Sequence, residues 1–419
     1  MKKIIYMVFL CCICTQMQAQ EYADLIRKNP AMAAANMTNY NFEDCRHTPA
    51  PKGYKAFYIS HYGRHGSRYH SNDRYAGILW PVMRKADSLN LLSEAGKSFY
   101  KDFSAVIQEQ CGMYGMLTTL GAKEQRGIAK RMATKFSDVF KGRNGRTEIF
   151  CQSSTSPRCL ISMTDFVHSF DRHTEGLNFQ FVTGEKYYDY LAYGHNPIES
   201  LRIADQKEDS LRRAVMKPLE LVDYLFVDRN RALELIGDPY DFEKILYLVC
   251  CVGHLTDYGV CLLSYFPTDI LIRNWEARNA RFYLAYGMAQ ETAEYHEETS
   301  RRLISDFISR AEIAVKENSN IAADFRFGHD TSLLPMLGHI GIEGIPYRPA
   351  FENVTSVFNS SVSICMASNL QLIFYRNKAG DVLVKVLYNE KETAIPALET
   401  VFGSYYRWSD LENYLKSLI

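Results

Sequence analysis

A short segment, Gly63-Arg64-His65-Gly66-Ser67-Arg68, combines residue types that can transfer a phosphoryl group. Arg64 and Arg68 flank His65, and the planar fork of an arginine side chain fits two phosphate oxygens at once. An imidazole between two such cations can attack phosphorus as a nucleophile. Gly66 lets the backbone approach a bound ligand closely. The pattern therefore predicts an anion site built around one histidine.

This motif resembles that of the histidine phosphatase superfamily, and two later segments resemble its acid phosphatase and phytase branch. The first runs from Ser153 to Cys159 and contains Arg158; the second is Gly328-His329-Asp330-Thr331. The resemblance implies that Arg158 and His329 bind phosphate and that Asp330 is the proton donor. Residues 117–121 also resemble a segment of this family. The order of these motifs along the chain is the one the family shows.

Within that branch, the chain is most similar to multiple inositol-polyphosphate phosphatases. The late stretches at 367–370 (ASNL) and 386–391 (VLYNEK) carry this similarity. The chain departs from the subgroup at His329-Asp330, where His-Ala-Glu is usual, and at His70, where the family motif commonly ends in proline. Both departures leave the substrate open, although every catalytic group is present.

The resemblance also implies a mechanism. His65 attacks phosphorus and forms a phosphohistidine, while Asp330 protonates the leaving alkoxide and later accepts a proton from water. The positive pocket is formed by Arg64, Arg68, Arg158 and His329. These cations should keep the His65 imidazole neutral, so we expect an acidic to neutral pH optimum.

No metal ion and no other cofactor is expected, because the arginines supply the positive charge that a metal ion provides in other phosphoryl-transfer enzymes. Tyr69 and His70 follow the motif directly and are possible residues of the pocket rim. A packing role is equally compatible with their positions.

Strands should end directly before each of the motifs. Residues 55–62 (KAFYISHY), 147–152 (TEIFCQ) and 322–327 read as strands, and open α/β sheets bind ligands at the carboxyl ends of their strands. Two further strands are expected at 370–375 and 382–388. The spacing thus predicts that one edge of a sheet gathers the candidate site residues.

Helices are expected between these strands. Thr118 or Thr119 is suited to cap the start of a helix, and Ser409 with Glu412 resembles a capping box at the start of the last one. An apolar stripe recurs every fourth position at Ile128, Met132, Phe136 and Phe140. The sequence therefore predicts an α/β fold with a central, mainly parallel sheet flanked by helices, and a mostly helical inserted cap domain.

The first twenty residues resemble a signal peptide. Lys2 and Lys3 precede an apolar run at 4–14, and Ala19 marks a plausible cleavage point. The run is too short to span a bilayer comfortably, so an exported protein, periplasmic or extracellular, is expected. The expected organisation is a signal peptide at 1–20, an α/β core at 21–75, 145–185 and 318–419, and mainly helical insertions or cap at 76–144 and 186–317.

The composition excludes strong global attraction to polyanions. Lys plus Arg and Asp plus Glu both number 48, which gives no reason to expect nucleic acid or a membrane surface as a partner. The expected partner is a small-molecule phosphate monoester. The 11 cysteines include three in the signal peptide, and the other eight permit disulfides without requiring them. The sequence leaves the oligomeric state and the disulfide pairing open.

Several functions compete. The favoured hypothesis is a secreted phosphomonoesterase acting on inositol phosphates such as phytate, and the alternative is an acid phosphatase of broad specificity. A phosphotransferase similar to phosphoglycerate mutase shares the Arg-His-Gly motif, but the signal peptide and the helical insertions argue against it. A protein that only binds phosphorylated ligands belongs to a different class, and the intact His65 and Asp330 argue against that hypothesis.

Overall fold

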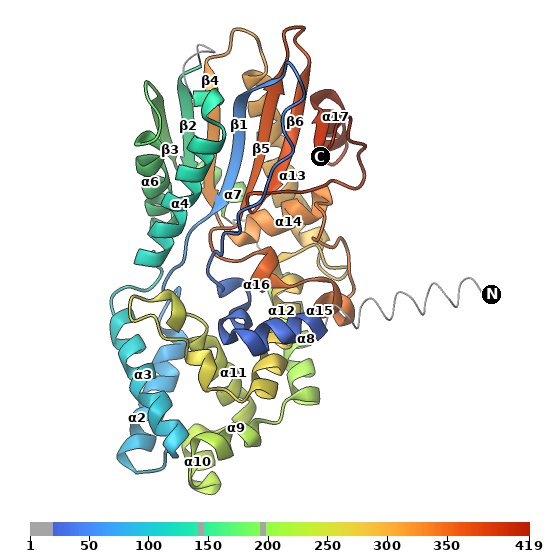
Figure 1. The fold of residues 1–419 in the computed structure, drawn as a ribbon. Coiled ribbons are helices and arrows are strands. Elements are labelled where there is room, and N and C mark those ends of the chain that lie inside the picture. The colour runs from blue at the N-terminus through green and yellow to red at the C-terminus, as the bar shows by residue number, and fades with distance from the viewer. Residues whose placement is uncertain (1–19, 141–145, 193–197) are drawn as a thin grey trace, which may run out of the picture.

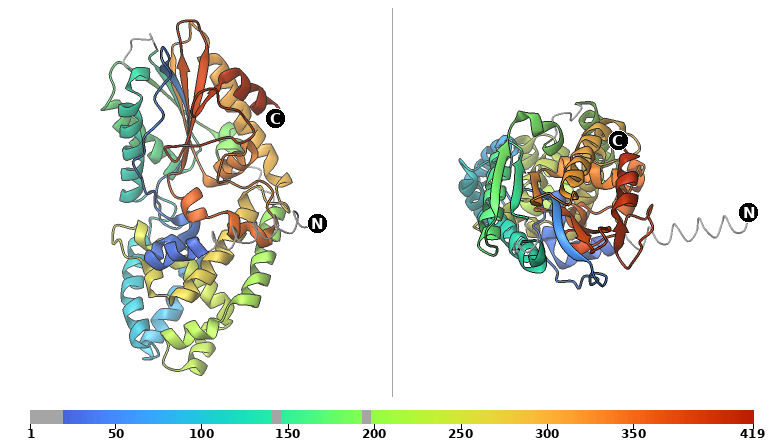
Figure 2. Two further views of the ribbon diagram at one scale, coloured as in Figure 1. Left: turned by 45° about the vertical axis from the view of Figure 1, so that its right-hand side comes forward. Right: turned by 90° about the horizontal axis from the view of Figure 1, so that it is seen from above.

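The computed structural model describes residues 20–140, 146–192 and 198–419. Residues 1–19 of the signal peptide expected at 1–20 lie outside the described residues, and this signal peptide stays a prediction. Figure 1 shows two lobes: a sheet covered by helices forms the upper lobe, and a bundle of helices forms the lower one. The dark-blue N-terminal segment lies where the two lobes meet, as both side views show (Figures 1 and 2).

The upper lobe is built on an eight-stranded mixed sheet with the order β3-β2-β4-β1-β5-β6-β7, and β8 pairs with β6. The strands β1 to β4 are parallel to one another, whereas β5 runs antiparallel to β1 and the remaining pairs are antiparallel. The bounds are β1 (Lys55–Arg64), β2 (Glu148–Ser153), β3 (Asn178–Thr183), β4 (Ile321–Gly328), β5 (Asn369–Arg376), β6 (Val382–Tyr388), β7 (Lys391–Glu392) and β8 (Tyr405–Arg407). The predicted α/β class is confirmed, with the parallel strands as the core of a mixed sheet.

The central strand β1 is buried on both faces because alternate side chains of a strand point to opposite sides. Tyr58 and Tyr62 enter the hydrophobic core on one face, while Ile59 enters the core on the other. Such two-sided burial explains why this strand reads as an almost continuous apolar run rather than as an alternating pattern. The edge strand β3 is mostly exposed. The sequence does not predict this strand, because its apolar pattern is weak.

One face of the sheet is covered by α4 (Thr119–Lys135), α5 (Ser137–Phe140) and α6 (Pro157–Asp171). The predicted apolar stripe is buried in this layer, and the hydroxyl of Thr118 accepts the main-chain N–H of Gly121, so the predicted cap is confirmed. This layer supports the strands that carry the candidate site.

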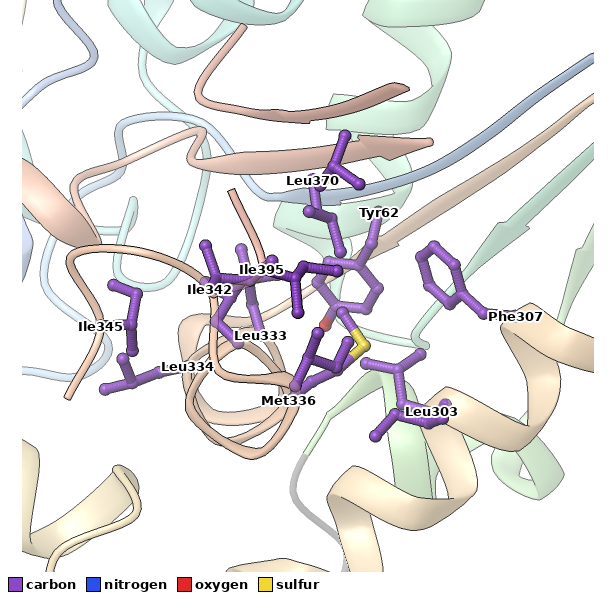
Figure 3. Packing of buried hydrophobic residues seen from close by; sticks show 14 of the residues in the cluster. Tyr62, Leu303, Phe307, Leu333, Leu334, Met336, Ile342, Ile345, Leu370 and Ile395 are labelled. Carbon is purple, nitrogen blue, oxygen red and sulfur yellow. The ribbon is translucent and has the colours of Figure 1, made fainter. Parts of the chain in front are cut away.

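The other face is covered by α13 (Glu294–Ala314), α14 (Asp330–Ile340) and α17 (Trp408–Lys416). Figure 3 shows apolar side chains of α13 and α14 around Tyr62, whose hydroxyl lies toward α14. The predicted capping box of the last helix is wrong: α17 already begins at Trp408, and Ser409 donates to its neighbour Asp410 instead.

The lower lobe has its own hydrophobic core. Its main helices are α2 (Arg74–Ser88), α3 (Glu94–Gln110), α8 (Ile198–Val215), α9 (Pro218–Leu225), α10 (Arg229–Ile236), α11 (Pro239–Cys250) and α12 (Thr268–Tyr286). The long helix α12 joins the lobes, since Trp275 packs in the lower core and Tyr283 in the core beneath the sheet. The region predicted as helical insertions therefore also contains α4, α5 and α13, which pack on the sheet rather than in the cap.

Short helical segments complete the described chain. They are the helical residues 20–28 and the pieces η1 (Pro30–Met37), η2 (Glu185–Tyr187), α7 (Tyr188–Leu191), η3 (Gly253–Leu255), η4 (Leu262–Tyr265), η5 (Phe351–Asn353), α15 (Val354–Val357) and α16 (Ser360–Ser363). The eight cysteines of the described residues are free thiols. Within the same ranges, no helix has the length and apolar character needed to cross a bilayer.

The aromatic cluster behind the sheet should carry much of the stability of the upper lobe. Phe166 of α6 is fully buried and packs against Phe325 and Phe327 with ring centroids 5.1 and 5.2 Å away. We expect Phe166→Ala to lower the free energy of unfolding by about 3–5 kcal/mol, because it removes buried apolar surface and leaves a cavity. Chemical denaturation followed by circular dichroism measures this change.

Phe181→Ala is the matched control, since that side chain on β3 is 54% exposed. It should change the free energy of unfolding by less than about 1 kcal/mol. Equal losses in both variants would contradict the assignment of the core.

Candidate active site

The register of the parallel strands brings the motifs to one edge of the sheet. Arg64, the last residue of β1, lies opposite Gly328, the last residue of β4. Ser153 ends β2 and lies opposite Phe327 on the other side of β4. Segments separated by more than a hundred positions in the sequence therefore continue from adjacent strand ends, as the strand pattern predicted.

His65 follows β1 and is buried at the centre of this edge. Its main-chain N–H donates to the carbonyl of Gly328 over 3.0 Å, and its Nδ1 lies 2.9 Å from the carbonyl oxygen of Gly66. A carbonyl can only accept, so Nδ1 carries the proton and Nε2 keeps its lone pair. The ring of His329 lies 5.3 Å away, centroid to centroid. The local geometry thus leaves the lone pair of Nε2 free.

The surroundings of His65 favour its neutral form. Burial and the neighbouring guanidinium groups of Arg158 and Arg64 hold the pKa of His65 well below its usual value, with smaller contributions from His329 and Arg68. A cationic imidazole would lose its water shell and face other positive charges. The neutral form of the His65 imidazole is therefore the favoured one.

Arg64 is completely buried, and its contacts determine the position of its guanidinium group. Nη1 donates to the carbonyl oxygens of Asn36 and Ile364 at 2.6 and 2.7 Å, and Nη2 lies 2.8 Å from Oδ2 of Asp330. An arginine held by two carbonyls and one carboxylate cannot swing out to solvent. It presents a permanent positive charge beside His65.

Asp330 is the first residue of α14, where the exposed N–H groups of a helix favour negative charge. Its Oδ1 accepts the main-chain N–H of Thr331 at 3.0 Å, and its Oδ2 accepts from the amide of Asn36 at 2.8 Å. Although burial opposes ionisation, Arg64 and Asn36 together hold the pKa of Asp330 below its usual value. Asp330 is consequently ionised in this arrangement.

His329 belongs to the third motif and contacts two residues of the second. Its Nδ1 is 3.3 Å from Nη2 of Arg158, and its Nε2 is 3.1 Å from the hydroxyl of Ser154. Because an arginine only donates, Nδ1 accepts and Nε2 carries the proton. Burial and the charge of Arg158 lower the pKa of His329 to about 3. The hydroxyl of Tyr62 accepts the main-chain N–H of His329 at 2.9 Å, which fixes the start of α14 against β1.

The motif loop is held from outside by α4. A Cβ atom at Gly66 would lie 2.4 Å from the carbonyl oxygen of Gly121, and one at Gly121 would lie 2.2 Å from that of Ser67. Only glycine fits at both positions. Glu124 accepts the main-chain N–H of Ser67 at 2.7 Å, and burial raises the pKa of this carboxyl to about 7. Residues 117–121, which resemble a segment of the phosphatase family, therefore help to hold the motif loop in place.

Of the two residues proposed for the pocket rim, the structure brings only one to a cavity. His70 lines a cavity of about 660 Å³, with its Nε2 3.1 Å from the carbonyl of Val249. Tyr69 is buried away from it and donates its hydroxyl to Glu109 of α3. Tyr69 therefore connects the motif loop to the lower lobe.

The cavity opens between the motif loop and the helices α2, α8, α11 and α12, and Arg68 of the motif forms part of its wall. The other cations of the wall are Arg74, Lys244, Arg278 and Arg281, and the carboxylates are Asp205, Glu208, Asp209 and Asp241. Lys244 and Arg281 form ion pairs with carboxylates of the wall. Among the described residues, no carboxylate pairs with Arg278, so its charge is available to a ligand.

Some residues of the site carry no local signal in the sequence. Asn36 contacts Asp330 across 294 positions, and Tyr62 supports the backbone of His329 across 267. Ser154 lies in the second motif, at 153–159, but the residues next to it in the sequence do not indicate its hydrogen bond to His329. Within the described ranges, no group of three or more His, Cys, Asp or Glu side chains is arranged to hold a metal ion.

The pKa of His65 can be measured directly. We expect its imidazole to titrate well below the ordinary histidine pKa of about 6.5, because burial and the arginines penalise the cation. Nitrogen chemical shifts of histidine-labelled protein report the protonation state, and the spectrum of His65→Ala assigns the signal. A titration with the ordinary midpoint would contradict this electrostatic description.

Solved structures share this fold at low sequence identity. The multiple inositol polyphosphate phosphatase of Bifidobacterium longum, in complexes with inositol hexasulfate and with phosphate, aligns with TM-scores of 0.74 and 0.75 at 19% identity, over 92% of this chain and 97% of that one. The phytase from D. castellii aligns with a TM-score of 0.68 at 14% identity, over 93% of this chain and 85% of the other. The Hafnia alvei phytase in complex with tartrate gives 0.56 at 11% identity, over 88% and 98%.

The sequence itself matches no protein-family model and none of the curated proteins. The likeness therefore concerns the fold, and it extends over both lobes, since the alignments cover about nine tenths of the chain. The resemblance stated from the motifs is confirmed at this level: the chain has the fold of the histidine acid phosphatases and phytases.

Proposed function

We propose that this protein is a phosphatase that hydrolyses phosphate monoesters through a phosphohistidine at His65. The observation that carries the proposal is one buried cluster in which a neutral imidazole lies among arginines, with Asp330 held against Arg64. A nucleophile, a set of cations for the phosphoryl oxygens and a carboxyl group thus occupy one site. The shared fold with known phosphatases supports the same conclusion.

The reaction has two steps in this proposal. In the first, Nε2 of His65 forms a bond to phosphorus as the ester P–O bond breaks, and Asp330 gives its proton to the departing alkoxide. In the second, a water oxygen attacks phosphorus, the P–N bond breaks and the carboxylate of Asp330 takes a proton from that water. The products are an alcohol and inorganic phosphate. Arg64, Arg68 and Arg158 neutralise the charge on the transferred group throughout.

Asp330 must be protonated when the first step begins, yet its pairing with Arg64 favours the carboxylate. A bound phosphate dianion brings negative charge to Arg64 and so weakens its effect on Asp330. The pKa of the carboxyl then rises toward or above its ordinary value. This coupling explains why we expect activity at acidic to neutral pH, where the acid form is accessible and His65 remains neutral.

Inositol phosphates such as phytate are the substrates that we favour. The cavity beside the motif loop is large enough for a ring with several phosphates, and Arg278, for which the described residues show no ion pair, adds positive charge to its wall. The similar B. longum protein was solved with inositol hexasulfate, which carries sulfate groups on the ring where phytate carries phosphate groups. The reaction requires no divalent metal in this proposal, because arginines neutralise the phosphoryl oxygens.

A broad-specificity acid phosphatase is the second candidate, and the cavity wall supplies an observation in its favour. Four carboxylates line the same cavity, and only some of them are paired with Lys244 and Arg281. Such a wall tolerates uncharged alcohols beside the phosphate and disfavours very highly charged ones.

We also propose that the mature chain is exported. The mass of the protein recovered from the periplasmic or extracellular fraction tests whether residues 1–20 have been removed.

Phosphate release tests the proposed reaction. In the presence of a chelator, the unaltered protein should release phosphate from phytate, from p-nitrophenyl phosphate or from both, and His65→Ala should lower kcat by about a thousandfold or more. His168→Ala, an exposed histidine on α6, is the control and should keep full activity. Unchanged turnover in His65→Ala would exclude the assigned nucleophile, and inactivity of the folded parent chain toward both esters would exclude the function.

The cavity can be tested separately from the reaction. We expect Arg278→Ala to raise KM for phytate about tenfold and to change KM for p-nitrophenyl phosphate much less, because only the larger substrate reaches that side chain. Arg84→Ala on α2, exposed and outside the cavity wall, is the control. Equal effects on both substrates would show that Arg278 does not contribute to selection of inositol phosphates.

A further inference from the structure

We propose that Asn36 is the positioning residue of the proton donor, and that its side-chain amide orients Asp330 toward the leaving group. The inference rests on the proposed function and adds a residue that no motif contains. Asn36 belongs to η1, the N-terminal segment at the junction of the two lobes (Figures 1 and 2). It thus reaches the site from an element other than the strands and α14.

Two contacts join Asn36 to the catalytic cluster. Its Nδ2 donates to Oδ2 of Asp330 over 2.8 Å, and its carbonyl oxygen accepts from Nη1 of Arg64 over 2.6 Å. Both contacts are buried, and only 5% of Asn36 is exposed. Oδ2 of Asp330 therefore lies between two donors, and the direction of the carboxyl plane depends on both of them.

The residue before Asn36 has a strained backbone conformation, which indicates that the surrounding structure holds this segment in place. Ala35 has φ 54° and ψ −132°, a conformation that residues with a Cβ rarely adopt. Its carbonyl accepts from the hydroxyl of Thr38 at 2.9 Å, while those of the preceding residues Ala33 and Met32 accept from Tyr247 and Ser361. The surrounding structure thus holds the segment in this shape, which turns the side chain of Asn36 toward Asp330.

The amide can serve both protonation states of Asp330. In the described geometry its N–H donates to the carboxylate, while Oδ1 of Asn36 is buried and has no hydrogen-bond partner among the described residues. Rotation of the amide by half a turn would present Oδ1 to a protonated Asp330 and accept its O–H. Asn36 thereby keeps the carboxyl in place before it loses its proton to the alkoxide and after it regains one from water.

Substitution of the side chain isolates this role. The contact with Arg64 uses the main-chain carbonyl of Asn36, so it persists when the amide is removed. In Asn36→Leu the volume is similar, but Asp330 loses one of the groups that orient it. The phosphate-binding arginines and His65 keep their own contacts. The variant should therefore damage proton donation selectively.

Leaving-group dependence gives the test, since p-nitrophenolate is a weak base that departs with little help from an acid, whereas an alkoxide needs the proton. We expect Asn36→Leu to lower kcat for glycerol 2-phosphate about tenfold or more, and kcat for p-nitrophenyl phosphate less than about threefold. Asn36→Ser, whose side chain is too short to reach Asp330, should give the same selectivity if Asn36→Leu folds poorly.

Asn359→Leu is the matched control. Asn359 is buried to a similar degree in the same part of the fold but contacts Ser361 and not Asp330, so both substrates should respond to it equally. Equal losses for both esters in the Asn36 variants, or no loss for either, would overturn the inference while leaving the proposed function intact. Absence of phosphate release by the unaltered chain would instead overturn the proposed function and this inference with it.

Discussion

The ion pair between Arg64 and Asp330 is the interaction on which the rest of the site depends. It joins the end of β1 to the start of α14 at 2.8 Å, where the side chain of Arg64 is fully buried and that of Asp330 is 10% exposed. A buried charge without a partner would cost several kcal/mol, so each of the two groups requires the other in the absence of a bound anion. The carbonyls of Asn36 and Ile364 complete the coordination of Arg64 and tie two more segments to it.

The cluster around this pair carries more positive than negative charge. Arg64, Arg68 and Arg158 face one carboxylate, and the two histidines stay neutral because burial and these same cations disfavour their protonation. A phosphate dianion can balance this excess positive charge, and in the proposed mechanism its binding weakens the pairing that keeps Asp330 ionised. The proposed mechanism therefore links phosphate binding and proton donation through the guanidinium group of Arg64.

The sequence predicted the parts of this arrangement that depend on local pattern. Strand ends, the α/β class, the cap at Thr118 and the gathering of the motifs at one sheet edge follow from apolar patterning and from the geometry of parallel strands. Contacts across long separations were not predictable. Nothing next to Asn36 indicates Asp330, and the hydroxyl of Tyr69 points to Glu109 because the lower lobe packs there. The edge strand β3 was not predicted because its apolar periodicity is weak. The start of α17 was predicted wrongly because a short capping pattern alone does not determine where a helix begins.

In the proposed function, the upper lobe carries the reaction and the lower lobe contributes to the selection of the substrate. The reacting groups lie at strand ends whose register leaves little freedom, and glycines 66 and 121 allow no side chain between the motif loop and α4. The cavity wall, in contrast, comes largely from helices of the lower lobe, whose surface residues are constrained only by solvent and by one another. Changes in α8, α11 or α12 can therefore alter which phosphate ester is admitted without moving His65. Asn36 lies at the junction of the lobes and contacts Asp330, the proton donor of the proposed mechanism, so a shift of the lower lobe relative to the sheet would reach the proposed chemistry through this side chain.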